Sequence, residues 1–384
     1  MRARTTLVAA TAVALTTALT TALTTALAAP ALAATDDHAA TGTAVRAAVA
    51  AGVPGVTATA QDRRGTWSTT AGVGNLRTGA PRSAEDRYRV ASITKTFVAT
   101  VVLQLEAEGR LSLDDTVDTW LPGVVRGHGH DGRRITLRQL LNHTSGIYDY
   151  TSDPEFTTRY LLADGFLKHR NDTRTPGELV GIAMAHGPDF TPGTSWSYSN
   201  TNYVLAGMVI EKATGHGFGQ EIERRVIEPL RLRATSVPGT RSTVPSPSSR
   251  AYSKLAPTAE GRTYDVTRLN PSLASAAGEM ISSSADLNRF YSALLRGRLL
   301  PPQQLKEMKT TVRLDGVPNL SYGLGLMDQT LSCGVHVWGH TGGIHGSASV
   351  ATTTADGRHS LALNFNGDWA GDLNQVLEAE YCGD

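Results

Sequence analysis

A serine and a lysine one helical turn apart are the first candidates for chemistry in this sequence. They lie in Ser92–Lys95, at the start of a segment, residues 92–108, whose apolar residues recur at helical spacing and which ends at Gly109. This spacing places Ser92 and Lys95 on the same face of a helix. A serine hydroxyl becomes a nucleophile when a base takes its proton, and a lysine can be that base when its pKa is lowered. An N-cap serine followed by a surface lysine is the alternative.

Tyr198 and Asn200 form a second candidate element, ahead of a predicted helix over residues 201–214 that ends at Gly215. A phenol can relay protons to a leaving group, and an amide can hold a substrate carbonyl. A loop tyrosine that packs ahead of a helix would show the same pattern. The element therefore indicates a site only in combination with others.

The third candidate element is Gly339–Gly343, which contains His340 and Thr341 and follows a strand-like segment at residues 335–338. Small residues here would let a substrate backbone approach the strand edge, and an exposed N–H could form half of an oxyanion hole. His340 would supply a positive or hydrogen-bonding group near the nucleophile. A strand followed by a glycine turn is the alternative for this segment alone.

In this order, the three elements resemble the hallmarks of the penicillin-recognising serine hydrolases, which are Ser-x-x-Lys, Tyr-x-Asn and a Lys/His-Thr-Gly strand. The resemblance covers about residues 38–384 and includes Leu140–Gly146 and Ala277–Ser283. The chain is most similar to the secreted D-alanyl-D-alanine carboxypeptidase/transpeptidase group, which also carries His-Thr-Gly. Class C β-lactamases, related to this group, usually carry Lys-Thr-Gly.

The resemblance implies acyl transfer without a cofactor or a metal. Ser92, deprotonated through Lys95 and Tyr198, would attack the substrate carbonyl, and the N–H groups of Ser92 and Gly343 would stabilise the oxyanion. Tyr198, assisted by His340, would pass a proton to the leaving group. The implied substrate-binding residues are Asn200, Thr341, Gly342 and Gly343.

The implied substrates are D-amino-acid-terminated peptides such as peptidoglycan precursors, and β-lactam antibiotics would acylate the same serine. However, the carboxypeptidase group has an arginine shortly before the cysteine, whereas residues 327–332 contain none, and Gly343 stands where that group often has Thr or Ser. Both changes remove contacts to a terminal carboxylate. A D-stereospecific peptidase, amidase or esterase is therefore the alternative to a carboxypeptidase, and a β-lactamase or a non-catalytic binding protein are others.

Other kinds of site receive less support. The sequence has no Gly-x-Ser-x-Gly motif, which argues against an α/β-hydrolase. His128 and His130 have no matched cluster of partner residues, so we predict a solvated loop there and not a metal site. The 36 Lys and Arg against 35 Asp and Glu give a net charge of +1. This balance argues against a protein that binds the phosphate backbone of a nucleic acid.

The elements that must position these residues indicate one α/β domain over residues 35–384. Strand patterns occur at residues 56–61 and 66–73, and again at 348–354 and 360–364 around a turn at Asp356-Gly357. Helical patterns occur at 44–51 and at the C-terminal end, and dominate the middle of the chain. We predict the serine β-lactamase/DD-peptidase fold: an antiparallel sheet flanked by helices, from about residues 38–90 and 275–384, with a mainly helical region at about 91–274.

Residues 1–34 have the features of a signal peptide, with Arg2 and Arg4 before an Ala/Leu/Val/Thr stretch and a small-x-small site at Ala31–Ala33. A retained membrane anchor is the alternative. We expect a secreted, extracellular, monomeric protein without a membrane segment after cleavage. In an oxidising compartment Cys333 and Cys382 are the only cysteines available to each other, which predicts a disulfide in preference to two free thiols.

Overall fold

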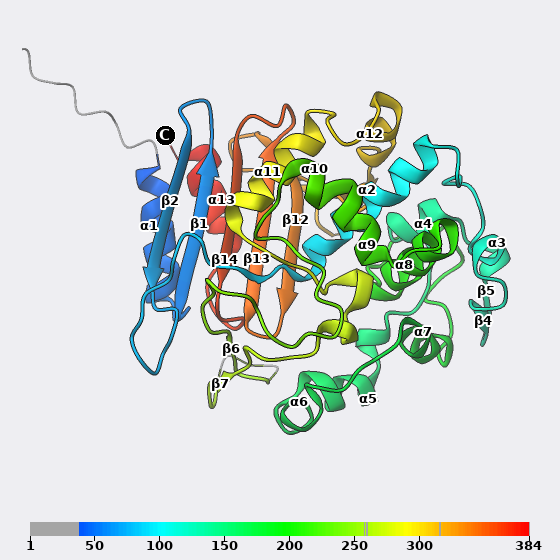
Figure 1. The fold of residues 1–384 in the computed structure, drawn as a ribbon, viewed down its shortest axis with the longest axis horizontal. Coiled ribbons are helices and arrows are strands. Elements are labelled where there is room, and N and C mark those ends of the chain that lie inside the picture. The colour runs from blue at the N-terminus through cyan, green and yellow to red at the C-terminus, as the bar shows by residue number, and fades with distance from the viewer. Residues whose placement is uncertain (1–37, 257, 259, 315, 384) are drawn as a thin grey trace, which may run out of the picture. The chain divides into compact units, whose positions relative to one another are not determined.

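An eight-stranded antiparallel sheet, built from early and late parts of the chain, carries the structure (Figure 1). The computed structural model describes residues 38–256, 258, 260–314 and 316–383, which belong to one compact unit. The predicted signal peptide, residues 1–34, lies outside the described residues. None of the described helices combines the length and apolar character needed to cross a bilayer.

The strands of this sheet run in the order β2-β1-β14-β13-β12-β11-β10-β9. Strand β14 thus lies between β1 and β13, with Ala58 opposite Leu363. Both predicted hairpins, β1–β2 and β13–β14, are confirmed. The bounds are β1 (Gly55–Gln61), β2 (Thr66–Gly72), β9 (Val312–Arg313), β10 (Leu320–Tyr322), β11 (Met327–Thr330), β12 (His336–Ile344), β13 (Ser347–Thr354) and β14 (Ser360–Phe365).

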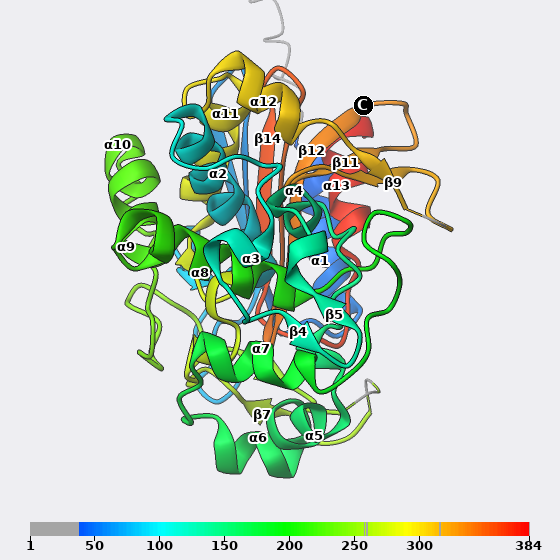
Figure 2. The same cartoon turned by 90° about the vertical axis from the view of Figure 1, so that its right-hand side faces the viewer.

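Helices cover both faces of the sheet (Figure 2). On one face lies α11 (Ser284–Leu295), whose apolar residues share a core with Ala351 and Ala362 of the sheet. On the other face lie α1 (Ala39–Ala50) and α13 (Leu373–Cys382), with Val350 and Leu363 between them and the sheet. Because successive side chains of a strand point to opposite faces, β14 is buried on both sides, and its residues are apolar apart from Ser360 and Asn364.

A mainly helical region beside the sheet carries α2 (Thr94–Ala107) and α8 (Asn200–Thr214) at its centre. Nearly every residue of α2 is buried, including the polar side chains of Lys95, Thr96 and Thr100. The other helices are α3 (Val117–Trp120), α4 (Leu137–Leu141), α5 (Pro154–Phe156), α6 (Ala163–His169), α7 (Pro176–Met184), α9 (Phe218–Ile222), α10 (Glu228–Leu230) and α12 (Pro302–Met308). Short strands pair as β3 (Tyr88–Arg89) with β8 (Ile281–Ser282), β4 (Arg126–Gly127) with β5 (His130–Asp131), and β6 (Tyr252–Ser253) with β7 (Tyr264–Asp265).

Three predicted elements differ from the structure. The first helix begins at Ala39, five residues before its predicted start. Helix α2 begins at Thr94, after a 3₁₀ turn at Ala91–Ile93. The predicted solvated loop at residues 127–132 is exposed at His128, but it forms the β4–β5 hairpin, which buries His130.

The glycine-rich segment Gly339–Gly343 lies inside strand β12, not in a turn after it. Strand β12 pairs with β13 through to Ile344, and its glycines permit close contacts. A Cβ at Gly339 would lie 2.0 Å from the Ala351 carbonyl oxygen, and a Cβ at Gly342 would lie 2.1 Å from that of Val90. Gly339 and Gly342 are therefore required by packing against neighbouring backbone and not by a turn.

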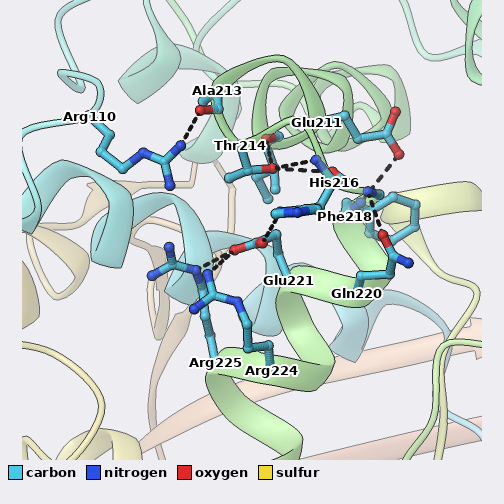
Figure 3. Close-up of polar contacts among 12 residues, drawn as sticks. Arg110, Glu211, Ala213, Thr214, His216, Phe218, Gln220, Glu221, Arg224 and Arg225 are labelled. Carbon is cyan, nitrogen blue, oxygen red and sulfur yellow. Dashed lines mark hydrogen bonds and ion pairs between the residues drawn. The ribbon is translucent and has the colours of Figure 1, made fainter.

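Two sets of contacts hold distant parts of the chain together. Cys333 and Cys382 form the predicted disulfide, which joins the turn after β11 to the end of α13. Near α9, the buried carboxylate of Glu221 accepts hydrogen bonds from Arg224 and Arg225 and contacts His216 (Figure 3). Arg225 also pairs with Glu108, the residue after α2, so this cluster fixes α9 against the end of α2.

Candidate active site

Ser92 lies on the 3₁₀ turn that leads into α2. The preceding residue, Ala91, has φ 47°, which is unusual for a residue other than glycine and marks a strained backbone. Strands β12 and β13 hold this segment in place, because Gly342 packs against Val90 and the Ser347 hydroxyl donates to the Arg89 carbonyl at 2.7 Å. The sheet thus fixes the position of the serine.

The side chain of Lys95 is fully buried beside Ser92. Its Nζ atom lies 3.0 Å from Ser92 Oγ, and 2.8 Å from both Asn200 Oδ1 and the Ala277 carbonyl oxygen. Burial lowers the pKa of Lys95 to about 7, although the charge of Asp149 acts in the opposite direction. A substantial fraction of the amine is therefore unprotonated at neutral pH, as a general base for Ser92 requires.

Tyr198 contacts both of these residues. Its hydroxyl is hydrogen-bonded to the Ser92 side chain, and the Lys95 Nζ atom lies 4.8 Å from the centre of its ring. Loss of contact with water raises the pKa of Tyr198, so the phenol is neutral. The hydroxyl can therefore carry a proton between Ser92 and a group bound next to it.

His340 lies in β12, next to Thr341. It is buried, and its two ring nitrogens contact the Thr341 carbonyl and the Tyr322 hydroxyl. Burial, together with the nearby Lys95, lowers the pKa of His340 to about 3. The ring is therefore neutral at physiological pH, which favours the hydrogen-bonding role predicted for His340 over the positive one.

The predicted substrate-binding residues divide into three groups. Gly343 faces open space, and Thr341 is exposed on the same side of β12. Gly342 points the other way, against Val90, so the structure gives it a packing role and not a substrate contact. Asn200 reaches Lys95 with its amide oxygen, while its nitrogen donates to Asp149 at 3.0 Å.

A cavity of about 590 Å³ opens beside the serine. Ser92, Asn200 and Gly343 form part of its wall, so a bound carbonyl could meet the nucleophile and the N–H of β12 together. The wall of the cavity combines apolar side chains with polar and charged ones, among them Lys254, His345 and Asp368. Its larger apolar side chains are Tyr150, Phe156, Leu161, Leu255, Leu273, Ile344 and Trp369.

A second groove, of about 390 Å³, lies beside β12 at Thr341. Thr341 and Gln329 line it, and it shares Asp368 and Trp369 with the cavity. Its lining residues include the carboxylates of Asp368 and Asp372, and none of them is a lysine or an arginine. The groove therefore offers no cation for a terminal carboxylate.

Two chemical groups that contact the site residues could not be identified from the sequence, a backbone carbonyl and a carboxylate. The Ala277 carbonyl that accepts from Lys95 belongs to the backbone, so no side chain marks it. Asp149 lies 51 residues from Asn200 in the chain and meets it only in the folded structure. Among the described residues, no group of three or more His, Cys, Asp or Glu side chains is arranged to hold a metal ion.

Comparisons with known proteins agree with this geometry. The family model described as "Beta-lactamase" matches residues 39–374. A solved structure of a D-stereospecific amidohydrolase from Streptomyces sp. is 64% identical, with a TM-score of 0.87, and the match covers 90% of this chain and 99% of that one. D-amino acid amidase from Ochrobactrum anthropi SV3, solved with L-phenylalanine amide, is 29% identical over 90% of this chain and 98% of its own, with a TM-score of 0.77.

Among curated relatives, penicillin-binding protein 4* of Bacillus subtilis is 28% identical over 314 residues, which is 77% of this chain. The chain spans 64% of the length of that relative and 50% of the putative penicillin-binding protein PbpX from the same organism. These matches confirm the predicted serine β-lactamase/DD-peptidase fold.

Proposed function

Since the chain belongs to the β-lactamase family of serine hydrolases, we propose that it is a D-stereospecific amidohydrolase that works through an acyl-enzyme on Ser92. The observation that carries this proposal is the contact between Ser92 and the buried amine of Lys95. The similarity to the D-stereospecific amidohydrolase from Streptomyces sp. supports the choice of substrate class.

In the proposed reaction, Lys95 takes the hydroxyl proton of Ser92 as Oγ bonds to the substrate carbonyl carbon. The N–H groups of Ser92 and Gly343 stabilise the oxyanion of the tetrahedral intermediate. The carbon–nitrogen bond then breaks as the proton passes, through Tyr198, to the departing nitrogen. Water attacks the resulting ester, gives up a proton to the same base, and releases the acid and Ser92.

The charges around β12 favour an amide or ester over a carboxypeptidase substrate. A carboxypeptidase must bind a terminal carboxylate next to the scissile bond, but the groove beside Thr341 contains Asp368 and Asp372 and no cationic side chain among its described lining residues. A carboxylate there would meet like charge. The Ser92 cavity does contain a lysine, Lys254, but its Nζ atom already donates to the Gly261 carbonyl and to Thr263. This is why we place the D-stereospecific amidohydrolase ahead of the D-alanyl-D-alanine carboxypeptidase/transpeptidase, to which the chain is related at the level of the family.

We also propose that the protein acts outside the cytoplasm as a monomer. The signal-peptide features of residues 1–34 and the disulfide between Cys333 and Cys382 support export to an oxidising compartment. Peptides with D-residues, including those of peptidoglycan, are then candidate substrates.

The experiment that tests the proposal compares D- and L-phenylalanine amide, D-phenylalanine methyl ester and an N-acyl-D-alanyl-D-alanine peptide with the purified protein. We expect Ser92-dependent release of ammonia or alcohol from the D-compounds, and little from the L-amide. Ser92→Ala should keep the fold and lose turnover. Preferential release of D-alanine from the peptide would instead support the carboxypeptidase, and equal turnover of D- and L-amides would overturn the proposed stereospecificity.

A further inference from the structure

We infer that Asp149 is a positioning residue that holds the Asn200 amide with its oxygen toward Lys95 and thereby directs the lone pair of Lys95 at Ser92. The inference rests on the proposed acyl-enzyme function, and it adds a residue that lies outside the three motifs. Asp149 belongs to the loop between α4 and α5, just before a 3₁₀ turn at Tyr150–Ser152.

The contacts of Asn200 define the orientation of its amide. The amide nitrogen lies 3.0 Å from Asp149 Oδ2 and 3.2 Å from Thr151 Oγ1, and the amide oxygen lies 2.8 Å from Lys95 Nζ. An ionised carboxylate can only accept hydrogen bonds, so it selects the nitrogen of the amide as its neighbour. With both of its N–H groups engaged in this way, Asn200 presents its oxygen to Lys95.

This orientation matters because an unprotonated lysine has two N–H groups and one lone pair. Asn200 Oδ1 and the Ala277 carbonyl oxygen are both acceptors at 2.8 Å, and together they engage the two N–H groups. The lone pair is then left to face Ser92 Oγ, 3.0 Å away. A reversed Asn200 amide would instead direct an N–H group at the lone pair and compete with the serine for it.

Asp149 is itself held firmly enough to act in this way. It accepts hydrogen bonds from the backbone N–H of Thr151, at 3.1 Å, from the Thr151 side chain and from the backbone N–H of Asn200. Asn200 is the first residue of α8, so the carboxylate also lies where the helix dipole favours negative charge. Burial raises the pKa of Asp149, whereas these donors and Lys95 lower it.

The assignment changes the predicted role of Asn200. Because its amide nitrogen is engaged by Asp149 and Thr151, Asn200 acts on the base and not on the substrate amide. Asp149 itself is not part of the cavity wall, although Thr151 and Asn200 are. We therefore expect loss of Asp149 to affect kcat and not KM.

The test is a double-mutant cycle on D-phenylalanine amide, with Asp149→Asn, Asn200→Ala and the double variant. Asp149→Asn offers Asn200 a donor as well as an acceptor, so kcat should fall roughly 10- to 100-fold, as expected for loss of a buried hydrogen bond to a charged group, with KM unchanged. Once Asn200 is Ala, adding Asp149→Asn should reduce kcat no further. Independent, multiplying losses would overturn the inference.

The pH dependence of kcat provides a second test, because a residue with a purely structural role would not change the pH at which kcat falls. The titratable groups that interact with Asp149 are Lys95, Tyr148, Tyr150 and Tyr198. The charge of Asp149 raises the pKa of Lys95, so Asp149→Asn should move the acidic limb of the kcat profile to lower pH. Thr151→Val, the matched control, keeps that charge and should leave the limb in place.

Two further results decide the remaining cases. If Asp149→Asn does not fold, as judged by circular dichroism and thermal unfolding, Asp149→Glu serves instead, and it should keep the acidic limb at the wild-type pH because the carboxylate remains. A limb displaced in that variant would overturn the inference. Wild-type turnover that depends on Ser92 but is unaffected by Asp149→Asn overturns the inference alone, whereas absence of Ser92-dependent turnover overturns the proposed function with it.

Discussion

The Nε2 atom of His340 accepts a hydrogen bond from the Tyr322 hydroxyl at 2.9 Å. The Thr341 carbonyl can only accept, so the proton of the neutral ring lies on Nδ1, which faces that carbonyl. Both nitrogens are therefore engaged within β12 and β10. In a site whose histidine has a pKa of about 3 and whose lysine has a pKa of about 7, the lysine is the group that titrates near neutral pH.

We predict that kcat/KM falls as the pH drops through about 7, because protonation of Lys95 removes the base that activates Ser92. The measurement is a pH–rate profile between about pH 5 and about pH 9 in the wild type and in His340→Gln. The acidic limb should remain at the same pH in the variant. A limb that disappears with the imidazole would identify His340 as the titrating group.

We predict that benzylpenicillin leaves a persistent adduct on Ser92. The chain has the acylating serine and base, but it lacks the Glu-x-x-Leu-Asn motif with which class A β-lactamases activate the hydrolytic water. Mass spectrometry of the intact protein over time measures the adduct, and Ser92→Ala is the control. Rapid loss of the adduct would indicate a β-lactamase, and no adduct at all would contradict recognition of penicillins.

Neighbouring glycines of β12 provide a matched pair of substitutions. A Cβ at Gly342 would lie 2.1 Å from the Val90 carbonyl oxygen, whereas a Cβ at Gly343 would meet nothing within 4 Å. We expect Gly342→Ala to lower the free energy of unfolding by about 1–3 kcal/mol and to reduce kcat by displacing the turn that carries Ser92. Gly343→Ala should keep wild-type stability in urea unfolding. Equal stability of the two variants would contradict the close approach of β12 to that turn.

The Glu221 cluster should make stability depend on pH in acid. Hydrogen bonds from Arg225 and Arg224 lower the pKa of buried Glu221 from 4.5 to about 2. A depressed pKa stabilises the fold above the unfolded value, and this stabilisation disappears as the pH falls from about 4.5 toward about 2. Glu221→Gln should lose up to about 3 kcal/mol at neutral pH and show less acid dependence in thermal unfolding. Glu223→Gln, at an exposed neighbour, should behave as wild type.

Replacing Cys333 and Cys382 together by serine should destabilise the fold by about 4 kcal/mol, because the disulfide closes a long loop in the unfolded chain. The two cysteines are 49 residues apart in sequence. Urea unfolding of the double variant, beside reduced and oxidised wild type, measures this difference. A reduced wild type as stable as the oxidised one would show that the covalent link contributes little.

The sequence predicted the parts of this site that depend on local spacing. Ser92 and Lys95 are one helical turn apart, and their contact follows from that spacing once α2 forms. The hairpins at both ends of the sheet followed from alternating strands and turn residues. The Gly339–Gly343 segment was predicted as a strand edge, with a glycine turn as the alternative, and the structure has the strand. The Val90 carbonyl, which requires glycine at 342, comes from a distant part of the chain and could not be foreseen.

Properties that depend on burial could not be predicted from the sequence. The pKa of His340 depends on its burial between the sheet and the helices, which the neighbouring residues in the sequence do not predict. Asp149 reaches Asn200 across 51 residues, and Ala277 contributes only a backbone oxygen. These groups become visible only after α4, α8 and the segment before β8 are assembled around α2.

The position of β14 between β1 and β13 has a consequence for how this protein reaches its native state. Strand β1 is synthesised some three hundred residues before its partner, since Gln61 pairs with Ser360. The central sheet, and with it the strand that supports the nucleophile turn, cannot close until the last part of the polypeptide has emerged. A chain shortened before Ser360 would therefore lack β14 from the centre of its sheet and could not assemble the site around Ser92.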